Sequence, residues 1–213
     1  MQPTDISNPQ YFHKVVDCQW ACPAHTQVPR YIRMIAAGRF DDAYLLNWDS
    51  NVFPGILGRT CDRPCEPACR RGRVEENNGE KPEPVAICRL KRVAADHRSA
   101  DIEQRMRERL PDRIPGAERF RVACVGAGPS ALTVARDLAP LGYRVTLFEA
   151  DAKGGGFMRT QVPRFRLPEA VIDEEVGYIL RLGVELVGQR RIDSLKALLA
   201  EGYDAVFIGC GAP

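Results

Sequence analysis

Six of the eight cysteines lie within the first 88 residues, and their short spacings are typical of residues that bind iron or zinc. These six are Cys18, Cys22, Cys61, Cys65, Cys69 and Cys88. Iron–sulfur clusters need several thiolates that converge on one point, and closely spaced cysteines let one turn supply two of them. A tetrahedral zinc ion also takes four thiolates, and reduced cysteines also serve as small buried hydrophobic residues. The gaps of three residues favour iron and sulfur, with zinc and simple burial left as alternatives.

A second motif follows about forty residues later and is typical of dinucleotide binding. Its members are Gly126, Gly128, Pro129, Ser130 and Ala131, and Glu149 follows at the end of the next expected strand. Gly126 allows a tight turn, Gly128 lets a pyrophosphate approach the backbone, and Ala131 permits close packing of helix on strand. The acid at Glu149 suits a ribose hydroxyl and disfavours a 2′-phosphate. The motif alone does not distinguish FAD from NAD.

The composition restricts the class of protein. The chain has 213 residues, a net charge of +2, and 45% hydrophobic residues, and its mean hydropathy is -0.28. We therefore expect no nucleic-acid and no membrane partner. The N-terminus shows no signal peptide, so we expect a cytoplasmic protein, where clustered cysteines indicate a metal or a cluster more often than disulfides.

The pattern along the chain predicts three parts: a helical iron–sulfur domain at 1–95, a charged helix and linker at 96–119, and a nucleotide-binding domain at 120–213. In the first part we expect helices at 31–37, 40–48 and 85–96 and a loop at 51–60. Cys61, Cys65 and Cys69 would share one face if they lay on one helix. In the last part, strands at 120–125, 143–149, 184–187 and 205–208 alternate with helices at 129–141, 167–182 and 195–200, which predicts a doubly wound parallel sheet.

Nearly the whole chain resembles the N-terminal half of the glutamate synthase small-subunit family, which includes the corresponding region of dihydropyrimidine dehydrogenase. The likeness is carried by VPRYIRMIAAGRFDDAY, GRTCDRPCEPACRRG, PVAICRLKR, GAGPSALTVARDLAPLGYRVTLFEA, GGFMRTQVPRFRLP and EGYDAVFIGCGAP. The resemblance implies a helical domain with 4Fe–4S clusters, followed by an FAD domain of the Rossmann type. It also implies that NAD(P)H reduces FAD and that electrons leave singly through the clusters to a partner subunit or domain. Flavin contacts are implied for the loop from Gly155 and Gly156 through Arg159 to Val162, and near Gly211.

The resemblance also implies the cluster ligands, and here the chain departs from the family. One family cluster uses the equivalents of Cys22, Cys61 and Cys65 with a Gln or Glu at the place of Lys91. A protonated lysine cannot ligate iron, so we infer that Cys88, three residues earlier, is the fourth ligand. The other family cluster uses the equivalents of Cys18 and Cys69 with two upstream cysteines. Gln10 and His13 stand at those places, so that cluster is absent or uses His13.

The chain ends at Pro213, where the family's FAD domain gives way to an NAD(P)H domain, and we find no second glycine motif. We therefore expect either a fragment or one piece of a split enzyme, an FAD-dependent NAD(P)H oxidoreductase component that is not active alone. The expected function is electron transfer with FAD and one or two 4Fe–4S clusters. The alternatives are a zinc- or cluster-bearing assembly module without redox activity, and an inactive fragment.

Overall fold

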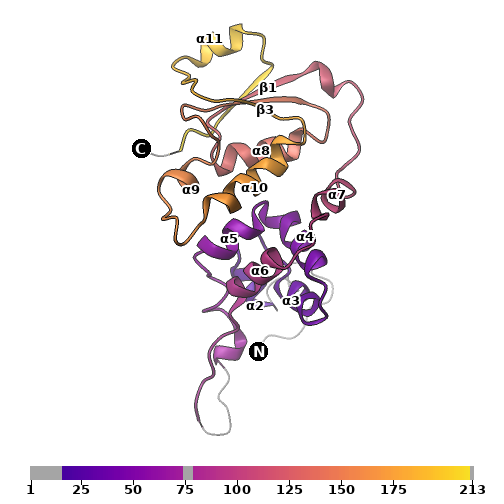
Figure 1. The fold of residues 1–213 in the computed structure, drawn as a ribbon, viewed down its shortest axis with the longest axis vertical. Coiled ribbons are helices and arrows are strands. Elements are labelled where there is room, and N and C mark those ends of the chain that lie inside the picture. Colours follow the sequence, from indigo (N-terminus) through magenta and orange to yellow (C-terminus); the bar gives the residue numbers. More distant parts are fainter. Residues whose placement is uncertain (1–15, 74–78, 212–213) are drawn as a thin grey trace, which may run out of the picture. The chain divides into compact units, whose positions relative to one another are not determined.

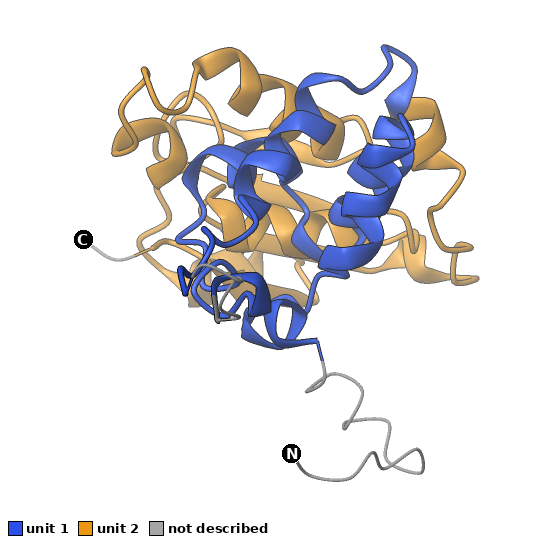
Figure 2. Ribbon diagram, turned by 90° about the horizontal axis from the view of Figure 1, so that it is seen from below, with its two compact units in different colours: residues 1–102 blue, residues 103–213 orange. Residues whose placement is uncertain are grey.

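The computed structural model describes residues 16–73 and 79–211, and these form two compact units, residues 1–102 and residues 103–213 (Figure 2). The boundary between the units falls inside the stretch 96–119 that the sequence marks as helix and linker. Among the described residues, no helix is long and apolar enough to cross a membrane.

Unit 1 is helical, as expected (Figure 1). Its elements are α2 (Asp17–Ala21), α3 (Val28–Ala36), α4 (Phe40–Asn51), α5 (Pro54–Thr60), the short 3-10 helix η1 (Arg70–Arg73) and α6 (Ile87–Asp96). Proline at the second position of α3 fits the first turn because the N–H it lacks has no partner there. Gly38 follows the end of α3 with a φ of 72°, a left-handed conformation that glycine adopts without strain.

The prediction of a loop over 51–60 is wrong, because most of this stretch is α5. Pro54, Gly55 and Gly58 locally disfavour a helix, but tertiary packing decides the conformation here. A Cβ atom at Gly58 would lie 2.8 Å from the Cα atom of Arg92 on α6. Glycine therefore lets the two helix backbones approach closely, and the Arg59–Asp96 ion pair, at 2.5 Å, joins the same two helices.

Cys61, Cys65 and Cys69 do not lie on one helix, so they do not share a helical face. Cys61 directly follows α5, and the residues from there to Cys69 form consecutive turns. The amide of Cys69 donates to the carbonyl of Glu66 at 3.0 Å, as in a turn. The three sulfur atoms are therefore positioned by a folded loop that α5 begins.

Unit 2 contains the expected parallel sheet, which confirms the predicted fold class. Its strands are β1 (Arg121–Val125), β2 (Arg144–Phe148), β3 (Glu185–Val187) and β4 (Ala205–Ile208), in the order β3-β2-β1-β4 with every pair parallel. The helical elements are α7 (Ile102–Arg107), η2 (Ala117–Arg119), α8 (Pro129–Leu138), α9 (Phe157–Thr160), α10 (Glu169–Leu180) and α11 (Leu195–Ala200). Figure 1 shows α8 and α10 on one side of the sheet and α11 on the other.

The sheet is buried at its centre and open at the β4 edge. In β1, Ala123 and Cys124 are fully buried, and Ala123 packs in one cluster with Phe148 of β2 and Leu198 of α11. In β4 the side chains are only partly covered, and Ile208 is 56% exposed. The central strands therefore fix the turn that follows β1, where the glycine motif lies.

We predict that Gly58→Ala destabilises unit 1 by about 1–3 kcal/mol, because the new methyl group would force α5 away from α6. Chemical denaturation followed by circular dichroism measures this loss. Gly72→Ala is the matched control, since a Cβ atom there meets only ordinary contacts at 3.6 Å. Equal stabilities of the two variants would show that the α5–α6 approach is not tight.

Candidate cluster and nucleotide sites

Tyr31 of α3 lies at the centre of the cysteine-rich part of unit 1. It is fully buried, and its hydroxyl donates to the carbonyl oxygen of Ile87 at 3.1 Å. Burial, together with negative potential from Cys65, Cys88, Cys18 and Cys22, raises its pKa well above the usual value. Tyr31 therefore stays a neutral phenol, and four of the cysteines lie near enough to influence it.

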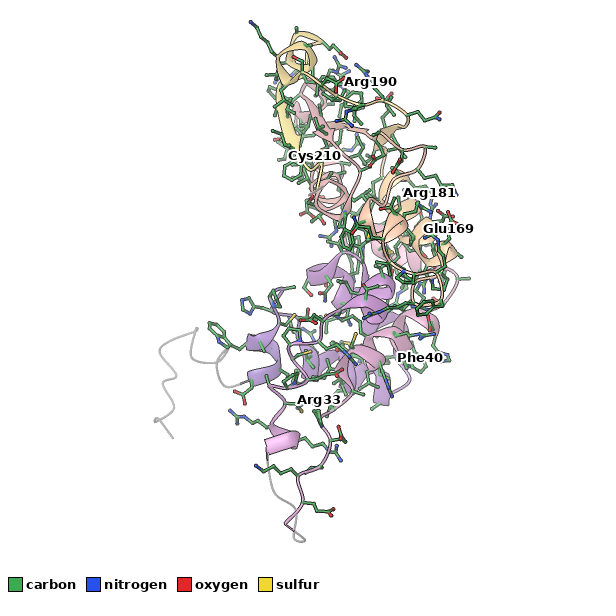
Figure 3. All side chains as sticks on the ribbon, turned by 90° about the vertical axis from the view of Figure 1, so that its left-hand side faces the viewer. Arg33, Phe40, Glu169, Arg181, Arg190 and Cys210 are labelled. Carbon is green, nitrogen blue, oxygen red and sulfur yellow. The ribbon has the colours of Figure 1, made fainter. Side chains whose placement is uncertain are left out.

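Four cysteines from three segments form the first group: Cys22 after α2, Cys61 and Cys65 in the loop after α5, and Cys88 in the first turn of α6. Cys65 interacts electrostatically with both Cys61 and Cys22, and Cys88 forms a hydrogen bond with Cys61. Figure 3 shows sulfur atoms gathered among the helices of this unit. The structure thus places Cys88, the inferred fourth ligand, near the three cysteines that the family resemblance implies for one cluster.

The side chains of Cys61 and Cys88 shift each other's pKa in opposite directions. The interaction with Cys88 lowers the pKa of Cys61 to about 5, and the interaction with Cys61, together with burial, raises the pKa of Cys88. The Sγ atom of Cys88 also lies 3.3 Å from the carbonyl oxygen of Leu57. The lowered pKa favours the thiolate of Cys61, the form that binds metal.

The loop that carries Cys61 and Cys65 is tied to the start of α6. Glu66 accepts a hydrogen bond from the amide of Cys88 at 3.0 Å, so its carboxylate joins the loop to the helix. Burial, followed by the neighbouring Cys61, raises the pKa of Cys65 to about 11. In the protein without a cluster, Cys65 is therefore a buried neutral thiol.

The second group consists of Cys18 and Cys69. Burial and the neighbouring Cys69 raise the pKa of Cys18, so the two sulfur atoms are close. The adjacent residues Asp17 and Arg70 form an ion pair at 2.7 Å that holds α2 against η1. Gln10 and His13, at the places of the family's other two ligands, lie outside the described residues.

The chemistry of the first group fits an iron–sulfur cluster, since soft sulfur donors suit such clusters. All eight cysteines of the chain are free thiols. In the described ranges, no three His, Cys, Asp or Glu side chains are grouped closely enough to hold one metal ion. A 4Fe–4S cluster makes a different demand, because each of its four thiolates binds a separate iron atom.

The glycine motif lies in the turn between β1 and α8, as expected. Gly126 has a φ of 96°, and a Cβ atom there would lie 2.4 Å from the carbonyl oxygen of Gly209. The amide of Gly126 donates to the carbonyl of Phe148 at 2.7 Å, and the amide of Gly209 donates to that of Val125 at 2.8 Å. Close backbone approach between the ends of three neighbouring strands therefore requires glycine at 126.

Gly128 differs because the protein's own packing does not require glycine there. A Cβ atom at Gly128 would meet only the carbonyl oxygen of Gly209, at 3.9 Å, and the Cα atom of Gly156, at 4.0 Å. No acid stands in the first turn of α8, and no side chain caps its N-terminus. The open space over Gly128 and the free N–H groups of Ser130 and Ala131 therefore suit the pyrophosphate of a dinucleotide.

Glu149 directly follows β2, and its carboxylate is hydrogen-bonded to the glycine turn. One oxygen of its carboxylate accepts from the amide of Ala127 at 2.8 Å, and the other accepts from the amide of Asp151 at 3.3 Å. The sequence predicts Glu149 as a ribose acceptor, but it does not indicate this second role. A carboxylate has further lone pairs, so the two roles are compatible.

The loop before α9 meets the glycine turn. The amide of Gly155 donates to the carbonyl of Ala127 at 2.8 Å. Gly156 has a φ of 51°, and a Cβ atom there would lie 2.8 Å from the Cα atom of Gly128. The structure therefore brings Gly155 and Gly156 beside Gly128, while Val162 follows α9 and Gly211 lies beyond β4 with a φ of 76°.

The guanidinium of Arg159, a predicted flavin contact, is engaged within the protein. It donates to the carbonyl of Gly154 at 3.0 Å and to the carboxylates of Glu169, at 2.7 Å, and Asp173, at 2.6 Å. Glu169, labelled in Figure 3, belongs to the first turn of α10. Arg159 therefore fastens the glycine-rich loop to α10, and its side chain is engaged with these groups.

Comparison with known proteins agrees with the division of the chain into two units. Residues 11–102 match the family described as dihydropyrimidine dehydrogenase domain II, 4Fe-4S cluster. Residues 124–185 match the family described as NAD(P)-binding Rossmann-like domain. The chain thus joins a domain that is similar to a 4Fe–4S cluster domain to one that is similar to a nucleotide-binding domain.

The curated relatives are subunits of oxidoreductases. The chain is 35% identical to NADP(+)-dependent formate dehydrogenase subunit beta of Moorella thermoacetica, over 91% of this chain and 29% of that protein. It is 34% identical to NADPH-Fe(3+) oxidoreductase subunit beta of Geobacter sulfurreducens (strain DL-1 / KN400), over 98% of this chain and 31% of that protein. It is 33% identical to NAD-dependent dihydropyrimidine dehydrogenase subunit PreT of Salmonella typhimurium, over 92% of this chain and 46% of that protein.

These matches confirm the resemblance of the chain to iron–sulfur subunits of oxidoreductases over nearly its whole length. The chain spans less than half of the length of these relatives.

We predict that Gly126→Ala destabilises unit 2 by more than about 2 kcal/mol, because it combines a clash with the Gly209 carbonyl and a strained backbone. Gly128→Ala is the matched variant and should change stability by less than about 1 kcal/mol. Thermal unfolding of both purified variants makes the comparison. A large loss in Gly128→Ala would mean that packing, and not a ligand, requires glycine at 128.

Proposed function

We propose that this chain is an electron-transfer component in which unit 2 binds FAD and unit 1 binds a 4Fe–4S cluster that delivers electrons to a partner subunit. The single observation that carries the proposal is the pairing, in one chain, of a four-cysteine group and a glycine turn at the N-terminus of α8. When bound, FAD accepts a hydride from NAD(P)H and releases electrons one at a time. The residues described here hold, orient and shield the two groups.

In unit 1, we assign Cys22, Cys61, Cys65 and Cys88 to the cluster. The assignment is supported by the mutual contacts of these cysteines and by the thiolate that the Cys61–Cys88 pair already provides. Cys18 and Cys69 are a ligand pair for a second cluster, which would need two further ligands. Cys65 and Cys88 are buried, while Cys22 and Cys61 are partly exposed.

In unit 2, the turn at Gly126 and Gly128 would hold the pyrophosphate at the N-terminus of α8, and Glu149 would orient the ribose. The loop at Gly155 and Gly156 would cover the nucleotide from the other side. Gly211 and Val162 complete the proposed contacts, while Arg159 acts by fixing the loop. FAD is favoured by the family resemblance, and NAD(P) is the alternative that the description of the matching domain family favours.

The names of the relatives also support a partner subunit for this chain. Proteins named as subunit beta act with other subunits, so we propose a partner subunit that accepts the electrons. The free state of all eight cysteines fits the reducing environment of the cytoplasm, where we place the protein.

The test of the proposal is cofactor analysis of the chain purified without oxygen. Iron and acid-labile sulfide in equal amounts, a broad visible absorption band and bound flavin are the expected results. Stoichiometric zinc with no visible band would instead establish the assembly-module alternative. Iron without any flavin or nucleotide binding would restrict the function to unit 1.

We predict that Cys88→Ser lowers the iron content and the visible absorption, because it removes one of four thiolate ligands. Elemental analysis of the anaerobically purified variant measures the loss. Cys124→Ser is the matched control, since Cys124 is buried in β1 of the other unit. The ligand assignment is wrong if Cys88→Ser keeps its full iron content while Cys69→Ser loses iron.

We also predict that Gly128→Val weakens FAD binding at least tenfold, because its side chain would occupy the space of the pyrophosphate. Glu149→Gln should weaken binding through the lost charge, by about 1–3 kcal/mol, while its amide oxygen still accepts from Ala127. Titrations of FAD, NADPH and NADH into the chain measure these affinities. Unchanged affinity for FAD in both variants would exclude this site, and binding of NADPH or NADH in place of FAD would establish the alternative.

A further inference from the structure

Lys91 of α6 is buried to an extent that is unusual for its type. Only 6% of it is exposed, and its helix neighbours Ile87 and Ala94 belong to the hydrophobic core of unit 1. Within the described part of the chain, no carboxylate pairs with Lys91 and no carbonyl accepts a hydrogen bond from it. A charge packed against a hydrophobic core acts on its neighbours more strongly than a charge in water.

Three cysteines lie within the electrostatic reach of Lys91. Its positive charge acts on Cys61, Cys65 and Cys88, in each case in the direction that stabilises the thiolate. Cys88 precedes Lys91 by three residues, so the two side chains are neighbours on the surface of α6. Three of the four cysteines of the first group therefore share one buried cation.

The carboxylate of Glu66, which also acts on Cys88, is engaged with other groups. Glu66 acts on Cys88, but its carboxylate accepts from the Cys88 amide at 3.0 Å and lies 3.8 Å from the guanidinium of Arg63. Lys91 is thus the buried charge whose effect on the sulfur atoms is not offset by a salt bridge of its own. The surrounding core keeps the local dielectric low, so this charge acts strongly.

We propose that Lys91 raises the reduction potential of the cluster held by Cys22, Cys61, Cys65 and Cys88, an inference that rests on the proposed cluster assignment. Reduction adds one electron, and therefore one negative charge, to a cluster that is already anionic. A buried positive charge beside its thiolates stabilises the reduced form more than the oxidised form. At position 91, the family has a Gln or Glu that binds iron. In this chain the residue there is Lys91, which would instead raise the reduction potential of the cluster.

The competing explanation is that Lys91 only packs, with its aliphatic stem filling space between α6 and the loop after α5. Lys91→Met keeps an unbranched stem of similar length and removes the charge. Lys91→Arg keeps the charge in a larger group. Arg89→Met is the matched control, because Arg89 lies exposed on the same helix, two residues away.

The experiment is an anaerobic redox titration of each purified chain with dithionite as reductant, followed by the visible absorption and the electron paramagnetic resonance signal. Iron content is measured first. We expect Lys91→Met to have a lower midpoint potential than the wild type, and Lys91→Arg and Arg89→Met to remain close to it. Lys91→Gln is titrated in the same way if Lys91→Met does not retain iron.

An unchanged midpoint in Lys91→Met or Lys91→Gln with full iron content would overturn the proposal. An equal shift in Lys91→Arg and Lys91→Met would show that shape and not charge is responsible, and would also overturn it. Loss of iron from both neutral variants, with iron kept in Lys91→Arg, would replace it by a role in cluster retention. Absence of iron from the wild type would instead refute the proposed cluster, which separates the two failures.

Discussion

The gathering of several thiols around one buried tyrosine is the constraint on which unit 1 depends. Sulfur atoms from three separate segments must meet in a space that the helices enclose, and each thiolate carries a charge that the interior disfavours. The structure offsets that charge in two ways: the interaction with Cys88 lowers the pKa of Cys61, and Lys91 supplies a positive charge from the same core. Tyr31 stays neutral and therefore adds no charge of its own.

The approach of α5 to α6 follows from this constraint. Cys61 directly follows α5, and Cys88 stands in the first turn of α6, so their hydrogen bond requires the two helices to lie close together. Gly58 permits that distance, and Arg59 with Asp96 holds the helices there. Burial disfavours the charge of Asp96, but the hydrogen bonds from Arg59 and Arg92 prevail and lower its pKa.

The sequence predicted the features that depend on local patterns. The glycine motif, the parallel sheet and the grouping of Cys22, Cys61, Cys65 and Cys88 needed only spacing, periodicity and the family resemblance. The sequence did not predict features that depend on contacts between residues far apart in the chain. Pro54, Gly55 and Gly58 are typical of a loop until α6 is present, and nothing near Arg159 in the chain indicates that Glu169 and Asp173 engage it. The sequence around Tyr31 does not indicate its position, because that position is defined by cysteines from other segments of the chain.

The glycines of unit 2 separate the demands of folding from those of a ligand. Gly126 and Gly156 each stand where a Cβ atom would collide with backbone, against Gly209 and Gly128 respectively. Folding alone accounts for both of them. Gly128 lies between these contacts, with an ordinary φ of -78° and room for a methyl group. A small residue at the N-terminus of a helix without a cap, next to space that the protein leaves open, is best explained by an anionic group that must approach the backbone there. This is why the nucleotide proposal depends on Gly128 more than on the rest of the motif.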